Sequence, residues 1–276
     1  MDSPGTAFRA LHRKGDPFVL ANAWDVGTAR LLVALGAAAI GTTSAGFAFT
    51  LGLPDGARIS REQALDHAAS LAAAVRVPVS ADLENGYGED PTDVAETIRL
   101  AGRAGLAGAS IEDIDLPGPG AYWFGRAVER VEAAVAAARA LPGDFVVCAR
   151  ADGLMTGVYG LDEAVRRIEG YAEAGADCVY IPALPDLAAV RRVCAAVPVP
   201  VNVLATGPLA AVSRAELAAA GAARISLGSG LARLAQATVR DAARAILDAG
   251  DFSPLRRVAS GDEIDALLEA GGREPA

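Results

Sequence analysis

Ser80-Ala-Asp82-Leu-Glu84-Asn-Gly-Tyr-Gly88 is the stretch of sequence that decides the fold of this chain. The apolar run at residues 75–79 leads into it and is typical of a short buried strand. Two carboxylates, Asp82 and Glu84, follow where that strand ends. In a parallel α/β protein the carboxyl ends of the strands form the active face. Because Mg²⁺ prefers oxygen ligands, this stretch predicts a magnesium site at one end of a parallel sheet.

The next two apolar runs also end in charged residues. Glu112 and Asp113 follow the run at 106–111, and Arg150-Ala-Asp152 follows the run at 145–149. Packing alone does not explain charge at three consecutive strand ends, so we expect these residues to face a common site.

Strand and helix signals alternate along the whole chain. Helices are expected between the strands, and the segment after Ser44 is expected to be a loop. We expect strands at eight places: 18–22, 37–43, 77–82, 107–112, 145–150, 177–181, 199–203 and 222–227. Eight such units in 276 residues predict an α/β fold, the (β/α)8 TIM barrel, as one domain over residues 1–276 with a C-terminal helical extension near 262–270.

Composition restricts the classes of function. The 34 acidic and 25 basic residues give a net charge of −9, which argues against a nucleic acid or an anionic membrane as partner. Lys14 is the only lysine, so chemistry that needs a buried lysine is nearly excluded. The three cysteines lack metal or redox spacing, and no signal peptide precedes the first strand, so we expect a cytoplasmic protein.

Several of these motifs, in this order, resemble the isocitrate lyase/phosphoenolpyruvate mutase superfamily over nearly the whole chain. Each motif alone is a weak signal, and their order at eight-strand spacing is what identifies the family. The motifs are Thr42-Thr-Ser-Ala-Gly46, Gly52-Leu-Pro-Asp55, Ala81-Asp-Leu-Glu-Asn-Gly-Tyr-Gly88, Ile111-Glu-Asp113, Ala149-Arg-Ala-Asp152 and Leu227-Gly-Ser-Gly230.

The resemblance implies a Mg²⁺-dependent enzyme, with Mn²⁺ as the alternative ion, that acts on small α-keto or 2-hydroxy carboxylates through a metal-bound enolate. It assigns Asp82 as the direct metal ligand and three further carboxylates around the ion: Glu84, Glu112 and Asp55. It assigns the substrate carboxylate to Ser44, Ala45 and Gly46. It assigns Arg150 to the oxyanion or a carboxylate of the substrate, and Asn202 to a further contact with the substrate. A structural ion pair between Arg150 and Glu112 is the alternative to the substrate role of Arg150.

One loop departs from the family pattern. Cleaving members carry a Lys-Lys-Cys-Gly-His motif after the fourth strand, where the cysteine is the acid/base. Here residues 116–125 read Leu-Pro-Gly-Pro-Gly-Ala-Tyr-Trp-Phe-Gly, without cysteine or lysine. The chain therefore resembles the 2-methylisocitrate lyase-like branch without that catalytic loop. Tyr122 is the catalytic candidate in this loop, beside Arg150 and Glu112, and the aromatic run 122–124 is expected to form a lid or a subunit contact.

The sequence favours a lyase or decarboxylase that breaks a C–C bond in a small α-keto or 2-hydroxy carboxylate. One alternative is a C–P or C–C hydrolase similar to phosphonopyruvate hydrolase, and another is a non-catalytic member that binds a carboxylate.

Other polar residues have more ordinary interpretations. Asp113 is expected to form a salt bridge, either behind the metal ligands or at the surface. Asp113 and Tyr87 are also further candidates for the proton carrier. Cys148 is expected in the core, His67 at the surface and His12 without a role.

The segment 231–249 is rich in alanine and apolar on more than one face, unlike a lone surface helix. In this superfamily the eighth helix is often swapped onto a neighbouring barrel, so the resemblance implies a homodimer or homotetramer.

Overall fold

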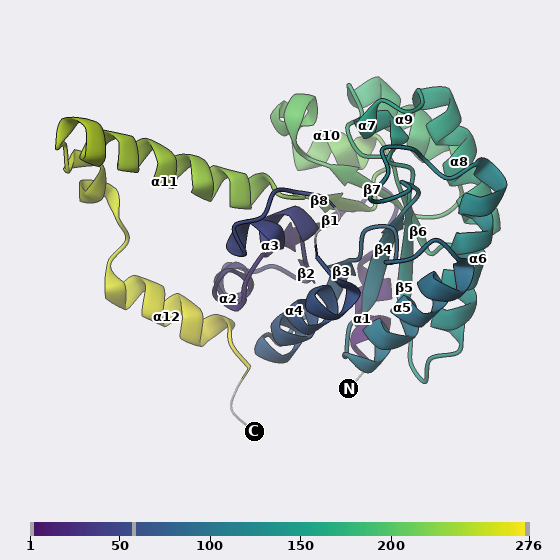
Figure 1. Cartoon of the computed structure of the whole chain (residues 1–276), viewed down its shortest axis with the longest axis horizontal. Helices are drawn as coiled ribbons and strands as arrows, with labels where there is room; N and C mark the ends of the chain where they lie inside the picture. The colour runs from purple at the N-terminus through teal and green to yellow at the C-terminus, as the bar shows by residue number, and fades with distance from the viewer. Residues whose placement is uncertain (1–2, 57–58, 274–276) are drawn as a thin grey trace.

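Eight parallel strands close into a barrel in the computed structural model, which describes residues 3–56 and 59–273 (Figure 1). Each strand pairs with the next, and β8 pairs with β1. The predicted (β/α)8 TIM barrel is confirmed. The strands are β1 Phe18–Asn22, β2 Ile40–Gly41, β3 Val79–Asp82, β4 Gly108–Glu112, β5 Val146–Arg150, β6 Cys178–Tyr180, β7 Val201–Leu204 and β8 Arg224–Ser226.

Helices surround the barrel, and several begin at a side chain that caps the first turn, such as Ser60 or Ser213. The α-helices are α1 Pro4–Leu11, α2 Val26–Ala34, α3 Ser44–Thr50, α4 Arg61–Ala74, α5 Pro91–Arg103, α6 Phe124–Arg139, α7 Gly153–Thr156, α8 Leu161–Glu173, α9 Leu187–Ala196, α10 Arg214–Ala219, α11 Gly230–Ala249 and α12 Gly261–Gly271. Two 3₁₀ helices are η1 Gly207–Ala211 and η2 Ser253–Arg257.

The prediction of a loop after Ser44 is wrong, because this segment forms α3. Thr43 caps the helix: its hydroxyl oxygen accepts a hydrogen bond from the Gly46 amide at 3.3 Å. The sequence Ser-Ala-Gly-Phe-Ala-Phe-Thr has few strong helix formers, so the cap and packing against the barrel decide the helix.

Aromatic rings of α1 and β1 pack together at the amino ends of the strands. Phe8 is fully buried and meets the rings of Phe18 and His12 edge-on, with centroids 5.9 and 4.8 Å away. His12 is therefore packed in this cluster, contrary to the sequence expectation. His67 is not a free surface residue either, since its ring stacks on Phe47 at 3.9 Å and its Nε2 lies 2.8 Å from the Trp24 carbonyl oxygen.

A buried carboxylate fixes the loops that follow β4 and β5. Asp113 Oδ2 accepts hydrogen bonds from the Tyr159 hydroxyl at 2.6 Å, the Tyr171 hydroxyl at 2.8 Å and the Arg167 guanidinium at 2.8 Å. Its Oδ1 accepts one from the Asp152 amide at 2.9 Å. Asp113 does form a salt bridge, but a buried one, and it holds the β5 loop in place.

The C-terminal helices leave the barrel. Figure 1 shows α11 extending away from it, and α12 returning to α2. Within α11 only Ala232 is buried, while Leu234, Val239 and Leu247 are exposed. No helix in the described part of the chain is both long and apolar enough to cross a membrane.

We predict that stability falls below about pH 6.5 in part because of His12. Burial, followed by the charge of Arg224, lowers the pKa of His12 from 6.5 to about 3. The neutral ring therefore stabilises the fold above pH 6.5, and this contribution is lost as the pH falls toward 3, by up to about 1.4 kcal/mol per unit. Urea unfolding at pH 7, 6 and 5 should show a weaker pH dependence for His12→Gln than for the wild type. Equal dependence in both proteins would contradict this.

We predict that Asp113→Asn lowers the free energy of unfolding by about 3 kcal/mol, because it removes the buried anion of Arg167 and leaves only the more exposed Glu163. Glu163→Gln is the matched control, since it removes the other, more exposed carboxylate on Arg167 and should cost less than about 1 kcal/mol. Urea unfolding of both variants measures the difference, and equal losses would refute a special role for Asp113.

Candidate active site

A cavity of about 150 Å³ lies inside the barrel toward the carboxyl ends of the strands. Its walls come from all eight strands, from the segments after β2 and β8, and from α7. A dry cavity of this volume is known to hold a molecule the size of benzene, so a ligand here is small. Six of the predicted site residues line it. Five are polar, namely Ser44, Asp55, Asp82, Arg150 and Asn202, and the sixth is Ala45 beside Ser44.

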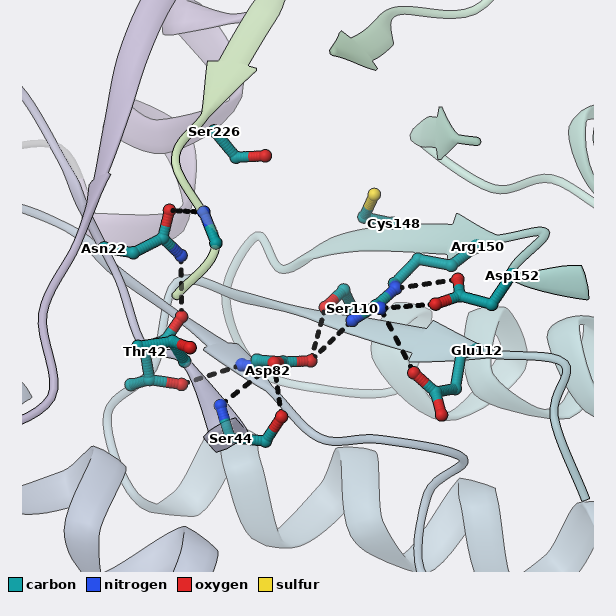
Figure 2. Close-up of polar contacts among 12 residues, drawn as sticks. Asn22, Thr42, Ser44, Asp82, Ser110, Glu112, Cys148, Arg150, Asp152 and Ser226 are labelled. Carbon is teal, nitrogen blue, oxygen red and sulfur yellow. Dashed lines mark hydrogen bonds and ion pairs between the residues drawn. The ribbon is translucent and has the colours of Figure 1, made fainter. Parts of the chain in front are cut away.

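Asp82 stands at the end of β3 with both carboxylate oxygens engaged (Figure 2). Oδ2 accepts hydrogen bonds from the Ser44 amide at 3.0 Å and the Ser44 hydroxyl at 2.8 Å. Oδ1 accepts one from Arg150 Nη1 at 2.7 Å and a long one from the Ser110 hydroxyl at 3.4 Å. Four groups from three different elements therefore fix the orientation of this carboxylate.

Arg150 is held by three carboxylates, each from the end of a different strand or its loop. Besides Asp82, Glu112 lies 3.1 Å from Nη2, and Asp152 takes both Nε at 3.0 Å and Nη2 at 2.6 Å (Figure 2). The pair with Glu112, which the sequence left as an alternative, is therefore present. Arg150 also lines the cavity, so the two interpretations do not exclude each other.

Acidic groups outnumber cations at this end of the cavity. Burial, then the neighbouring Asp152, Asp82 and Glu84, raises the pKa of Glu112 against the opposing effect of Arg150. Burial and the charge of Asp82 likewise raise the pKa of Asp55. Burial is the larger cause of both shifts, and the neighbouring negative charge adds to it, so a bound cation would lower both pKa values.

The donor chemistry fits Mg²⁺. The described residues include no three His, Cys, Asp or Glu side chains placed to ligate one ion together. Mg²⁺ does not require such a cage, because it keeps several waters and is usually bound through one or two carboxylates. Asp82 would be the direct ligand, and Glu112 and Asp55 would act through water.

Glu84 lies away from this cavity. Its backbone has φ +48°, an uncommon conformation for a residue other than glycine, and its side chain is buried beside a second, larger hollow lined by Asn85, Tyr87 and Leu116. It is close enough to Glu112 to contribute to the raised pKa of that residue. The structure thus brings Glu84 near the acidic cluster without placing it on the cavity wall.

The three consecutive residues expected to hold the substrate carboxylate are separated by the fold. Ser44 gives both its donors to Asp82, and Ala45 lines the cavity. The Gly46 amide instead donates to Thr43 within the first turn of α3. A Cβ on Gly46 would lie 2.6 Å from Thr43 Cγ2 and 2.9 Å from Trp24 Cβ, so close packing is what requires glycine there.

The structure places Tyr122 away from the cavity. Its hydroxyl accepts a hydrogen bond from Asn85 Nδ2 at 3.1 Å, and Arg130 lies over its ring at 4.2 Å. The aromatic run does not act as one cluster, because Tyr122 is buried, Trp123 is exposed and Phe124 begins α6. These contacts anchor the loop and do not aim Tyr122 at Asp82.

The deep end of the cavity holds polar residues from β5, β7 and β8. Asn202 Nδ2 donates to the Ser226 hydroxyl at 2.8 Å, and its Oδ1 accepts from Arg224 Nε at 2.8 Å. Arg224 Nη2 also donates to the Cys148 thiol at 2.8 Å. Despite burial, hydrogen bonding with Cys178 and the nearby Arg224 lower the pKa of Cys148 to about 7.

Sequence reasoning expected Asp152 at the common site but missed that it orients Arg150, and it missed Arg224 and Asn22. Arg224 was visible only as a charged residue within the strand expected at 222–227. Asn22 bridges the loops after β2 and β8: its Oδ1 accepts from the Leu227 and Gly228 amides at 2.8 and 2.9 Å, and its Nδ2 donates to the Thr42 carbonyl at 2.7 Å (Figure 2). An asparagine at the end of the first strand was the only sequence signal for it.

Comparison with known proteins identifies the family. Residues 8–247 match the phosphoenolpyruvate phosphomutase family model. The chain is 33% identical over 209 residues to 2-methylisocitrate lyase of Escherichia coli strain K12, which covers 73% of this chain and 69% of that protein.

Solved structures agree with that match. Phosphoenolpyruvate phosphomutase from Streptomyces platensis subsp. rosaceus is 32% identical, with a TM-score of 0.83 over 96% of this chain and 95% of that one. A phosphonopyruvate hydrolase complex with oxalate and Mg²⁺ is 26% identical, with a TM-score of 0.84 over 97% and 95%. The chain therefore belongs to the phosphoenolpyruvate phosphomutase family, within the isocitrate lyase/phosphoenolpyruvate mutase superfamily.

Proposed function

We propose that this protein is a Mg²⁺-dependent lyase or decarboxylase that breaks a C–C bond in a small α-keto or 2-hydroxy carboxylate. The observation that carries this proposal is the fixed Asp82 carboxylate, which faces a small cavity with Arg150 beside it and excess acidic charge around it. The 2-methylisocitrate lyase relative supports a lyase, and the hydrolase complex with oxalate and Mg²⁺ supports both the ion and a carboxylate ligand.

The chain's own residues would orient the ligand and supply fixed charge. The guanidinium of Arg150 is locked by three carboxylates, so it places a positive charge at the cavity wall without reorganisation. Ser44 and Ser110 hold Asp82 in the orientation needed to receive a cation. When bound, Mg²⁺ would stabilise the negative charge that develops as an enolate forms.

The loop at 116–125 favours decarboxylation within this group. Loss of CO₂ from a β-keto acid leaves its electron pair in an enolate and requires no protein acid in that step. Because the loop lacks the cysteine and lysine of the cleaving members and Tyr122 is buried against Asn85 and Arg130, no acid from this loop faces the cavity. Hydrolysis of a C–P or C–C bond is the second candidate, since the phosphonopyruvate hydrolase structure is similar over nearly the whole chain.

We predict that oxalate, a mimic of the pyruvate enolate, binds only with Mg²⁺ present. Asp82→Ala should abolish this binding, because it removes the direct ligand of the ion. Asp162→Ala, which removes an exposed carboxylate on α8, is the control and should bind like the wild type. Calorimetry with and without Mg²⁺ measures all three proteins. Absence of oxalate binding under both conditions would favour the non-catalytic alternative.

Turnover of oxaloacetate, 2-methylisocitrate and phosphonopyruvate then separates the enzymatic candidates. Pyruvate with CO₂ from oxaloacetate identifies a decarboxylase, and phosphate release from phosphonopyruvate identifies a hydrolase.

We also propose that residues 1–276 form one barrel domain whose α11 packs on a second copy in a homodimer or homotetramer. Val19 faces outward from β1 and is 37% exposed, so the described helices leave this face of the barrel partly uncovered. The exposed apolar residues of α11 are suited to cover such a face.

Light scattering should therefore find a dimer or tetramer. Leu234→Glu on α11 should shift the protein toward monomer, because a charge would be buried in the contact. Leu35→Glu, at an equally exposed leucine after α2, should leave the assembly unchanged. A monomeric wild type would contradict the proposal.

A further inference from the structure

Two arginines line the central cavity, and they differ in their counter-charges. Arg150 contacts three carboxylates at 2.6 to 3.1 Å. Arg224, which is 3% exposed, has no carboxylate within 4.0 Å among the described residues. The arginine that the resemblance implied for the substrate thus already has counter-charges in the protein, and the arginine without an acid lies deeper in the same cavity.

The partners of Arg224 are polar groups without a carboxylate among them. Nε donates to the Asn202 amide oxygen at 2.8 Å, Nη2 to the Cys148 thiol at 2.8 Å, and Nη1 lies 3.4 Å from Nε2 of His12. These contacts hold the guanidinium still. They use one N–H group on each of the three nitrogens. Each Nη carries a second N–H group, which is left to bond a ligand. A buried cation without an anion costs several kcal/mol, so its charge is available to an anion that enters the cavity.

We propose that Arg224 determines substrate specificity by binding a second anionic group at the deep end of the cavity. The Asp82–Arg150 end would take the α-keto or 2-hydroxy acid group, and Arg224 the second anion, with the Ser226 hydroxyl on the same wall. The inference rests on the proposed function only in taking the ligand to be a small acid. The cavity volume of about 150 Å³ restricts it to a short chain.

Cys148 is the other group that could neutralise Arg224. In Figure 2 the side chains of Cys148 and Ser226 enter the same central space from β5 and β8. A thiolate at Cys148 would compete with a ligand for the guanidinium, whereas a thiol leaves the charge available. Cys148→Ser removes the thiolate and keeps a small polar group, so it separates the two cases.

Three acids that differ only in the group bonded to C3 test the proposal by calorimetry with Mg²⁺ present. Racemic malate carries a carboxylate there, phosphonolactate a phosphonate and 2-hydroxybutyrate a methyl group. The wild type should bind malate or phosphonolactate about tenfold or more tightly than 2-hydroxybutyrate, which is what one charge-assisted hydrogen-bond site typically contributes. Whichever of malate and phosphonolactate binds more tightly identifies the anionic group bonded to C3 of the substrate.

Two variants should remove this preference by different routes. Arg224→Gln deletes the charge. Asn202→Asp places a carboxylate where the amide oxygen already accepts from Nε, so it neutralises Arg224 inside the protein and preserves the packing. Both should bring malate and 2-hydroxybutyrate to within about twofold of each other. Oxalate, which is short enough to occupy the Asp82 end alone, should still bind.

Two controls complete the series. Arg130→Gln makes the same change at a buried arginine outside the cavity and should keep the preference for malate. Cys148→Ser should keep it as well. An undiminished preference in Asn202→Asp and Arg224→Gln, equal binding of the three acids by the wild type, or no malate binding at all would overturn the proposal. Failure of oxalate alone, with malate still dependent on Arg224, would instead refute the enolate function and leave this inference standing.

Discussion

The Arg150 guanidinium and the three carboxylates around it are the interaction on which the site depends. Asp82, Glu112 and Asp152 come from β3, β4 and the loop after β5, and the same cation bonds all three. Without it, three acids at adjacent strand ends would repel one another in a largely dry space. With it, they hold fixed positions while some negative charge remains for a second cation. The ion pairs that hold these strand ends in place are thus also the ones around the cation site that we propose.

A second buried acid supports this arrangement from outside. One carboxylate oxygen of Asp113 accepts hydrogen bonds from two tyrosine hydroxyls and from Arg167. The other accepts one from the Asp152 amide. Asp152 in turn orients Arg150 through two hydrogen bonds. The loop that carries Tyr122 is tied to the same acid, because the Tyr122 amide donates to the Asp113 carbonyl at 2.9 Å. Rigidity at the mouth of the barrel therefore comes from buried, fully bonded polar groups.

The loop after β4, residues 116–125, bears most directly on the reaction that we propose. Where cleaving relatives present cysteine and lysine, this chain has glycine, proline and aromatic residues that anchor the loop to Asn85, Arg130 and Arg167. The cavity also holds an arginine, Arg224, at its deep end. The two proposals therefore assign reaction type to the mouth at β3–β5 and substrate choice to the interior at β5–β8.

The sequence by itself determined the architecture and the acidic core of the site. Eight strand-and-helix units predicted the barrel, and Asp82, Glu112 and Arg150 were located because each ends a strand, which is where parallel strands converge. Only the tertiary structure decided what each side chain contacts. It bonded the Gly46 amide to the Thr43 cap, placed Tyr122 in a buried cluster and left Arg224 without an acid. Strand position depends on local periodicity, whereas partners and burial depend on residues far apart in the chain, such as Arg224, Asn202 and Cys148.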